Sequence, residues 1–244
     1  MGDKTFFLEF KKLKRTYFFW VMAAAGAVGS LYSYMFFTIQ RTKIMNGGVS
    51  QTRMLLTQTY GLLAFVNLFA IIIGACTLFH VEYDSNGIKR LVSLPIRIQQ
   101  VFINKAVLLT FYILIIAAME GIGLFVTAFQ YIKGEAFAGE ILCFLVKVFI
   151  LSLPSAYLML FISSLCKNMW LTIGFGVAGL FSGLLYGGIS SVNIYVVNPF
   201  AAIFYPAVKM ATNIPAWVFA CTVIESILIL TICCNIMKRK EWVS

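Results

Sequence analysis

Three side chains that could carry charge or move a proton lie inside long apolar stretches of the sequence, namely Glu120, Lys147 and Glu225. A charge at the centre of a bilayer costs roughly 2.5–3.5 kcal/mol on insertion scales, so such residues usually face the protein interior and pair. Glu120 and Lys147 lie at similar depths in consecutive stretches, which predicts an intramembrane charge pair. Two roles stay open for it: an ion pair that holds two helices together, or direct contact with a cationic peptide substrate.

The remaining candidates for chemistry do not form a catalytic or metal-binding set. Glu225 has no cation at its depth, so we expect it to be protonated or to face a dimer interface. His80 is the only histidine, and its neighbours Glu82 and Asp84 are too few for a metal site. The six cysteines form no C-x-x-C pair, which argues against a zinc site or a disulfide framework. We therefore expect no metal and no catalytic residue.

Membrane-spanning helices must position these residues. The chain of 244 residues is 61% hydrophobic and 11% charged, whereas a soluble domain is nearer 45–50% apolar and about 25% charged. A bilayer core of about 30 Å needs about 20 apolar residues per helix. Six stretches meet that need and leave no room for a soluble domain, so residues 1–244 form one transmembrane domain. The spans are expected at residues 17–39, 55–79, 106–129, 141–165, 170–189 and 215–237.

Two shorter segments complete an all-α membrane fold with six transmembrane helices. Apolar residues recur at helical spacing near the N-terminus, with basic residues on the other faces, which predicts an amphipathic interfacial helix over residues 1–16. An unstructured basic anchor is the alternative. Residues 190–214, punctuated by Asn198, Pro199 and Pro206, predict a short re-entrant or interfacial helix before the last span. Gly179 and Gly183 form a G-x-x-x-G spacing, which permits close helix contact.

The Lys and Arg residues that produce the net charge of +10 gather at the ends of apolar stretches. This distribution is typical of a membrane protein rather than of a nucleic-acid-binding protein. With the N-terminus inside, thirteen cations lie on the cytoplasmic side, five lie outside, and Lys147 lies within a span. This asymmetry predicts that both termini and residues 80–105 lie on the cytoplasmic side. The thirteen are Lys4, Lys11, Lys12, Lys14, Arg15, Lys89, Arg90, Arg97, Lys105, Lys167, Lys238, Arg239 and Lys240; the five are Arg41, Lys43, Arg53, Lys133 and Lys209.

The longest polar interruption, residues 80–105, lies between the second and third spans and is expected in the cytoplasm. Gly87 and Pro95 punctuate it, and Ile88, Leu91 and Val92 between them could form one face of a short helix. Fixed between two spans, such a helix could act as a rigid peg. An ordinary solvated loop with positive-inside cations is the alternative, and the residues alone do not decide between them.

This segment resembles a pattern found between the second and third spans of type-2 ABC exporter permeases, written E…G…L…(S)LP…K. The matching residues are Glu82, Gly87, Leu91, Ser93-Leu94-Pro95 and Lys105. The layout of most of the chain is similar as well, and its size and compact loops most resemble permeases of lantibiotic-immunity and bacitracin-resistance transporters. Two features depart from the pattern. Ile88 follows Gly87 where many members have threonine, and His80 is no hallmark of the family.

The resemblance implies that residues 80–105 form a coupling segment that docks on a cytoplasmic ABC ATPase dimer. ATP and magnesium would be bound there, since the sequence has no G-x-x-x-x-G-K-[ST] phosphate loop, so this chain is expected to be no enzyme and to need no cofactor. A second permease chain, the same or related, would complete the pore in the lipid bilayer, and the cargo would be an antimicrobial peptide or similar hydrophobic compound. The expected coupling residues are Glu82, Asp84, Gly87, Ile88, Lys89, Arg90, Leu91 and Pro95.

Two other classes of protein fit the sequence less well than a transporter subunit does. An intramembrane protease needs paired Glu/His or Asp/Asp groups inside spans, which one interfacial histidine and two separated glutamates do not supply. A non-catalytic assembly or sensor protein would share the membrane layout. Co-purification separates these classes, because only a transporter subunit requires a bound ATPase whose hydrolysis falls when residues 80–105 are altered.

Overall fold

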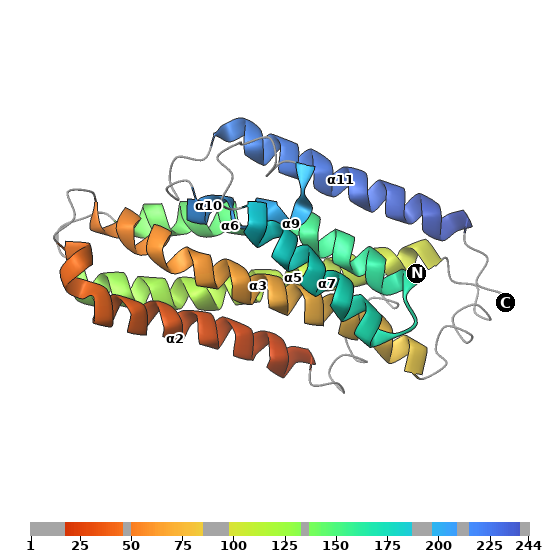
Figure 1. The fold of residues 1–244 in the computed structure, drawn as a ribbon, viewed down its shortest axis with the longest axis horizontal. Coiled ribbons are helices and arrows are strands. Elements are labelled where there is room, and N and C mark those ends of the chain that lie inside the picture. The colour runs from red at the N-terminus through yellow and green to blue at the C-terminus, as the bar shows by residue number, and fades with distance from the viewer. Residues whose placement is uncertain are drawn as a thin grey trace.

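The computed structural model describes residues 18–45, 50–84, 98–132, 137–186, 197–208 and 215–239. Within these ranges the regular structure is helical throughout (Figure 1). The expected interfacial helix at residues 1–16 lies outside them. The helices are α2 (Phe18–Met45), α3 (Gln51–Asp84), α5 (Ile98–Tyr131), α6 (Phe137–Leu165), α7 (Met169–Tyr186), α9 (Pro199–Ala202), α10 (Tyr205–Val208) and α11 (Ala216–Arg239).

Five of the described helices are long and apolar enough to cross a membrane: α2, α3, α5, α6 and α11. Each of them covers a span predicted from the sequence. The predicted fifth span corresponds to α7, which has 18 residues. At about 1.5 Å per residue, α7 is roughly 27 Å long, slightly less than a hydrocarbon core of about 30 Å. The chain is therefore a multi-pass membrane protein, and the sixth crossing stays a prediction.

The helices that flank the polar segment run further than hydropathy predicts. α3 continues past Phe79 to Asp84, and α5 begins at Ile98 rather than at Ala106. The reason is that polar residues end an apolar run but are compatible with a helical backbone, which Gly and Pro disfavour. Gly87 and Pro95 are the nearest breakers, and both lie beyond these helix ends. Residues 80–84 and 98–105 are therefore helical extensions of α3 and α5.

α3 is the central helix of the bundle, whereas α2 and α11 lie on its outside. α2 packs mainly on α5 and α3, and α11 packs on α6 and α5, so that these two helices lie on opposite sides of the bundle (Figure 1). The apolar window of α3 is the most buried of the five, and those of α2 and α11 are the least buried. The outer helices thus have the widest exposed apolar faces.

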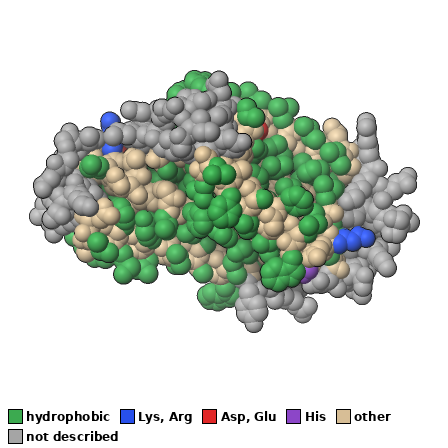
Figure 2. Space-filling view, viewed as in Figure 1, with side chains coloured by type: hydrophobic (Ala, Val, Ile, Leu, Met, Phe, Trp, Pro, Cys, Tyr) green, Lys and Arg blue, Asp and Glu red, His purple; other side chains and the backbone are tan. Residues whose placement is uncertain are grey.

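Apolar side chains cover much of the described surface, as lipid contact requires. In Figure 2 they spread along the bundle, while the Lys and Arg side chains visible on that face lie toward its two ends. Large aromatic residues such as Trp20, Phe129 and Trp170 are mostly exposed. In water such a surface would be an aggregation liability, so the bilayer is the solvent that this surface fits.

The short helices before α11 pack into the bundle through glycines of α7. A Cβ atom at Gly179 would lie 2.7 Å from the ring of Phe200, and one at Gly183 would lie 2.6 Å from the Phe200 carbonyl oxygen. The close approach that the G-x-x-x-G spacing permits is therefore present, with α9 as the partner. The Asn198 side chain accepts a hydrogen bond from the Phe200 amide at the start of α9 and donates one to Ser182.

The segment after α9 is held from the other side by α3. The hydroxyl of Tyr60 donates a hydrogen bond of 2.7 Å to the carbonyl oxygen of Ile203, and both residues are fully buried. Ala201, Ala202 and the other residues through Tyr205 are buried as well. These residues thus lie inside the bundle rather than on its surface, an arrangement that a re-entrant segment requires, although its depth in a membrane stays a prediction.

Candidate functional site

Glu82 and Lys105, the two ends of the polar segment, meet in a buried ion pair between α3 and α5. Lys105 Nζ lies 3.1 Å from Glu82 Oε1, and the two side chains are only 2% and 5% exposed. Lys105 also donates a hydrogen bond to the carbonyl oxygen of Leu78. Its ammonium group lies 4.9 Å from the centre of the Phe79 ring, within the range of a cation–π contact. The lysine is therefore surrounded by partners from α3.

The spacing along α3 explains how one lysine reaches all three partners. Leu78 and Phe79 precede Glu82 by four and three residues, so both lie on the face of the helix that carries Glu82. That face exists only because α3 continues through residues 80–84 as a helix. A loop beginning at His80, as the sequence suggested, would have left Glu82 without a fixed position. The helical extension is thus what creates the ion pair.

Two further hydrogen bonds join the same end of the bundle to α6 and α11. The hydroxyl of Tyr83 donates to the carbonyl oxygen of Ser164, at 2.7 Å, in the last turn of α6. The side-chain amide of Gln99 donates to the carbonyl oxygen of Cys234 in α11, at 3.0 Å. We call this end, where α3 ends and α5 begins, the Glu82 end. Four helices are joined there by side-chain contacts next to residues 85–97.

The predicted coupling residues are only partly described. Glu82 is placed and paired, and Asp84 ends α3. The other predicted coupling residues lie outside the described residues, so their docking role stays a prediction. They are Gly87, Ile88, Lys89, Arg90, Leu91 and Pro95.

Glu120 lies on α5 in the interior of the bundle, where it is 1% exposed. Its Oε2 accepts a hydrogen bond of 3.0 Å from the side-chain amide of Asn67 on α3. Lys147 is half-buried on α6, and among the described residues no ion pair joins it to Glu120. The structure therefore brings Glu120 to an asparagine and not to the predicted lysine. Asn67, an amide at mid-length of an apolar stretch, was the signal in the sequence for this contact.

The remaining predicted acid, Glu225, lies half-buried on the outer helix α11. Its Oε2 is buried and has no hydrogen-bond partner among the described residues. His80 is also half-buried, one turn before the end of α3. Within the described parts of the chain no group of three or more His, Cys, Asp or Glu side chains could hold a metal ion.

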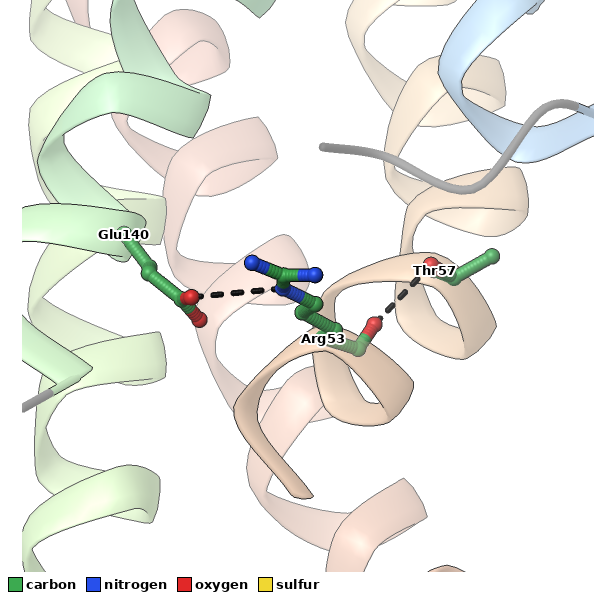
Figure 3. Close-up of polar contacts among 3 residues, drawn as sticks. All are labelled: Arg53, Thr57 and Glu140. Carbon is green, nitrogen blue, oxygen red and sulfur yellow. Dashed lines mark hydrogen bonds and ion pairs between the residues drawn. The ribbon is translucent and has the colours of Figure 1, made fainter. Parts of the chain in front are cut away.

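A second ion pair that was not predicted from the sequence lies at the opposite end of the bundle, which we call the Arg53 end. Arg53 Nε lies 3.3 Å from Glu140 Oε1, and the two side chains are 45% and 32% exposed. Figure 3 shows the pair bridging the first turns of α3 and α6, beside the hydrogen bond from Thr57 to the Arg53 carbonyl oxygen. The sequence placed both residues in outer loops, and this shared location was the available signal.

These features define a helical multi-pass membrane protein in which a buried ion pair joins the two helices that flank residues 85–97. A family model described as "ABC-2 family transporter protein" matches residues 5–183. Because this match covers well over half of the chain, the protein belongs to the ABC-2 transporter family. It is thus a permease subunit of an ABC transporter, and the family implies an ABC ATPase as partner. No curated protein matches the sequence.

The family match extends from the N-terminal segment through most of α7 and ends at Gly183. It therefore includes Glu82, Lys105, Glu120 and Asn67. α9, α10 and α11 follow the matched region, yet Phe200 packs on Gly179 and Gly183 inside it. The part of the chain beyond the match is consequently packed against the matched part.

Proposed function

We propose that this permease subunit belongs to an ATP-driven exporter of the bacterial plasma membrane that gives immunity or resistance to antimicrobial peptides of the lantibiotic type. The resemblance of residues 82–105 to exporter permeases supports export. The distribution of Lys and Arg supports an orientation in which the termini and residues 85–97 are cytoplasmic. The wide apolar surface supports a cargo that enters from the membrane.

The Glu82–Lys105 pair is the observation that carries this proposal. In the proposed cycle, ATP binding moves the docked residues 85–97. A loose attachment would let the helix ends unwind and absorb that movement. The buried ion pair, with the Lys105 bond to the Leu78 carbonyl, instead fixes α3 and α5 to each other at the point where the force enters. The two helices then tilt together.

The movement is passed on through the neighbouring contacts. Tyr83 connects α3 to α6, and Gln99 connects α5 to α11. A displacement of the Glu82 end therefore reaches four helices at once. At the Arg53 end, the ion pair between α3 and α6 is exposed and contributes little stability. Tilting would open that end more readily than the Glu82 end, as export requires.

An apolar groove on the outside of the bundle supports a lipophilic cargo. It lies between α5, α6 and α11, has a volume of about 590 Å³, and is lined by residues that include Phe111, Leu114, Phe149 and Leu230. A hydrogen-bonded pair of hydroxyl groups, Thr110 and Tyr157 at 3.1 Å, adds a polar point to its wall. A mostly apolar cleft with few polar groups suits an amphipathic ligand.

The working unit is proposed to contain two permease chains, either two copies or this chain with a relative, and an ATPase dimer. The exposed apolar faces of α2 and α11 offer contact surfaces for the second permease chain and for lipid. ATP and magnesium would be bound by the ATPase subunits, and the permease would contribute no catalytic group.

Purification of the tagged chain from its native membrane in mild detergent tests this function. We expect an ABC ATPase to co-purify, and cells with the intact chain to resist a lantibiotic better than cells that lack it. Arg90→Glu in the coupling segment should reduce ATP hydrolysis and resistance, whereas Lys133→Glu in the predicted outer loop serves as the matched charge reversal. Absence of an ATPase from the purified material, or equal effects of the two reversals, would contradict the proposal.

A further inference from the structure

The buried carboxyl group of Glu120 is only half satisfied by hydrogen bonding. Its Oε2 accepts the hydrogen bond from Asn67, but Oε1 is buried and has no hydrogen-bond partner among the described residues. A carboxyl oxygen without a donor is costly in an apolar interior. A glutamine could make the same contact with Asn67 without carrying a charge. Helix association alone therefore does not explain an acid at this position.

The unsatisfied oxygen faces α2 at a glycine. A Cβ atom at Gly29 would lie 2.6 Å from Glu120 Oε1 and 3.0 Å from the side chain of Leu63. Gly29 therefore presents no side chain to the carboxyl group on this side. α2 closes the site in the described conformation but supplies no polar group to it.

Small residues line the contact between α2 and α5 on either side of Gly29. Gly26 lies against Met119 and Ile116, and Gly123 of α5 lies against Ser30 of α2. Ser33 bonds back to the carbonyl oxygen of Gly29 within its own helix. Small residues permit close approach of helices. α2 is also an outer helix that packs mainly on α3 and α5.

We propose that Glu120, positioned by Asn67, receives the cationic group of the transported molecule, and that α2 is the cover that moves aside to admit it. The inference rests on the proposed function, since it names the site for a cationic amphipathic cargo. A carboxylate recognises a lysine ammonium or an arginine guanidinium through charge-assisted hydrogen bonds. In an interior of low dielectric constant this attraction is far stronger than in water.

The site would discriminate between cargo and lipid by charge. Acyl chains fit the apolar surfaces of the bundle but leave Glu120 Oε1 without a partner. An amphipathic peptide offers an apolar face for the same surfaces together with a cation for the carboxylate. While the site is empty, a proton neutralises the acid, because an isolated carboxylate is strongly disfavoured in such surroundings.

Carbodiimide labelling of the permease–ATPase complex in proteoliposomes tests the site directly. Dicyclohexylcarbodiimide enters membranes and reacts with protonated carboxyl groups: the carboxyl oxygen adds to the central carbon, and the proton moves to a nitrogen. Peptide mass spectrometry locates the adduct and distinguishes Glu120 from Glu82 and Glu225. We expect labelling at Glu120, with none at this position in Glu120→Gln. If Glu120 stays unlabelled, the proposed opening of α2 is wrong.

Protection by a matched pair of peptides tests the charge. One is an amphipathic helical peptide with lysines on its polar face, and the other is the same peptide with every lysine acetylated. At a concentration about ten times its dissociation constant, the lysine peptide should slow labelling of Glu120 about tenfold by mass action. The acetylated peptide should leave the rate unchanged. Equal protection by both, or protection by neither, would overturn the proposal.

ATP hydrolysis by the same complexes separates failure of the site from failure of the function. The lysine peptide should stimulate hydrolysis in the wild type but not in Glu120→Gln, and Glu120→Asp should be intermediate because its carboxylate is retracted by one methylene. Equal stimulation of wild type and Glu120→Gln would overturn the site and leave the export function standing. No stimulation of the wild type would contradict both. An equal yield of bound ATPase shows that the variants are folded.

Discussion

The two ends of the bundle use the same type of contact in opposite settings. At the Glu82 end a carboxylate and an ammonium are almost completely buried and the ammonium has further partners, whereas at the Arg53 end a carboxylate and a guanidinium are partly exposed. Removing one member of a buried ion pair leaves the other charge buried without a partner and is strongly destabilising. Breaking an exposed pair costs little stability. The comparison teaches that charge fixes the helices at the Glu82 end and not at the Arg53 end.

Lys105→Met should have the largest effect and would test the comparison most severely. The variant keeps an apolar stem but leaves Glu82 buried without its cation, which costs about 3–5 kcal/mol. We expect a lower melting temperature of the purified protein in detergent and a lower yield of the ATPase complex. Lys147→Met, on a half-buried lysine of α6, is the matched control and should be mild.

A double variant separates stability from coupling at this site. Glu82→Leu combined with Lys105→Met replaces the ion pair by apolar contacts, a change that is often neutral for stability. We expect the melting temperature to recover. Peptide-stimulated ATP hydrolysis should stay low, since apolar contacts do not restore the fixed geometry of α3 and α5 where they flank residues 85–97. A single Lys105→Met variant as stable as the wild type would refute the special role of this pair.

Gly183→Ala should have the next largest effect, because packing rather than charge holds the half of the bundle nearer the Arg53 end. The new methyl group would collide with the Phe200 carbonyl oxygen and approach the Phe204 ring at 3.1 Å. Overpacking of this kind costs about 1–3 kcal/mol. Gly174→Ala in the same helix meets no atom within 4 Å and should stabilise α7 by about 0.5–1 kcal/mol. Thermal melting of both variants gives the measurement. Equal melting temperatures would contradict the close packing of α9 against Gly183.

Removing one tyrosine hydroxyl group from each half of the bundle extends the comparison of the two ends to hydrogen bonds. Tyr60→Phe deletes the bond to Ile203, and Tyr83→Phe deletes the bond to Ser164. Interhelical hydrogen bonds in membranes average about 0.6 kcal/mol, so both losses in stability should be small. Tyr83→Phe should also lower peptide-stimulated ATP hydrolysis, because it loosens α6 from the Glu82 end. A larger loss of hydrolysis in Tyr60→Phe would reverse our assignment of the force-bearing end.

Arg53→Gln should have the smallest effect. The exposed pair with Glu140 is expected to contribute about 0.2–1 kcal/mol, and added salt should screen it. The melting temperature of the wild type should therefore approach that of Arg53→Gln as the salt concentration rises. A large loss that persists in high salt would mean that the Arg53 end is held as firmly by charge as the Glu82 end.

The sequence predicted the positions of the long helices well, because the length of an apolar run directly reflects the thickness of the bilayer. It was less successful at helix ends such as Asp84 and Ile98, where the chain stays helical without being apolar. Hydropathy reports the medium around a residue, and termination depends on local breakers. The ion pair of Glu82 with Lys105 depends on these extensions and was therefore not predicted as a contact.

The partner of Glu120 was missed for a geometric reason. Depth along the membrane normal can be counted from the sequence, and by this measure Lys147 was suitable. A contact also depends on the direction in which a side chain points around its helix and on which helices are neighbours. Glu120 points toward Asn67 of α3 and Gly29 of α2. Neither direction could be obtained from spacing along a single helix.

The shortness of α7 has a consequence for the surrounding lipid. A hydrophobic helix shorter than the acyl layer draws the nearby leaflets together or tilts its neighbours, at a cost of fractions of a kcal/mol per Å of mismatch. α7, with 18 residues, lies in a bundle whose other long helices have 24 or more. We therefore predict that, where α7 crosses the bilayer, the lipid beside it is thinner than elsewhere and bilayer thickness influences the resting shape of the permease.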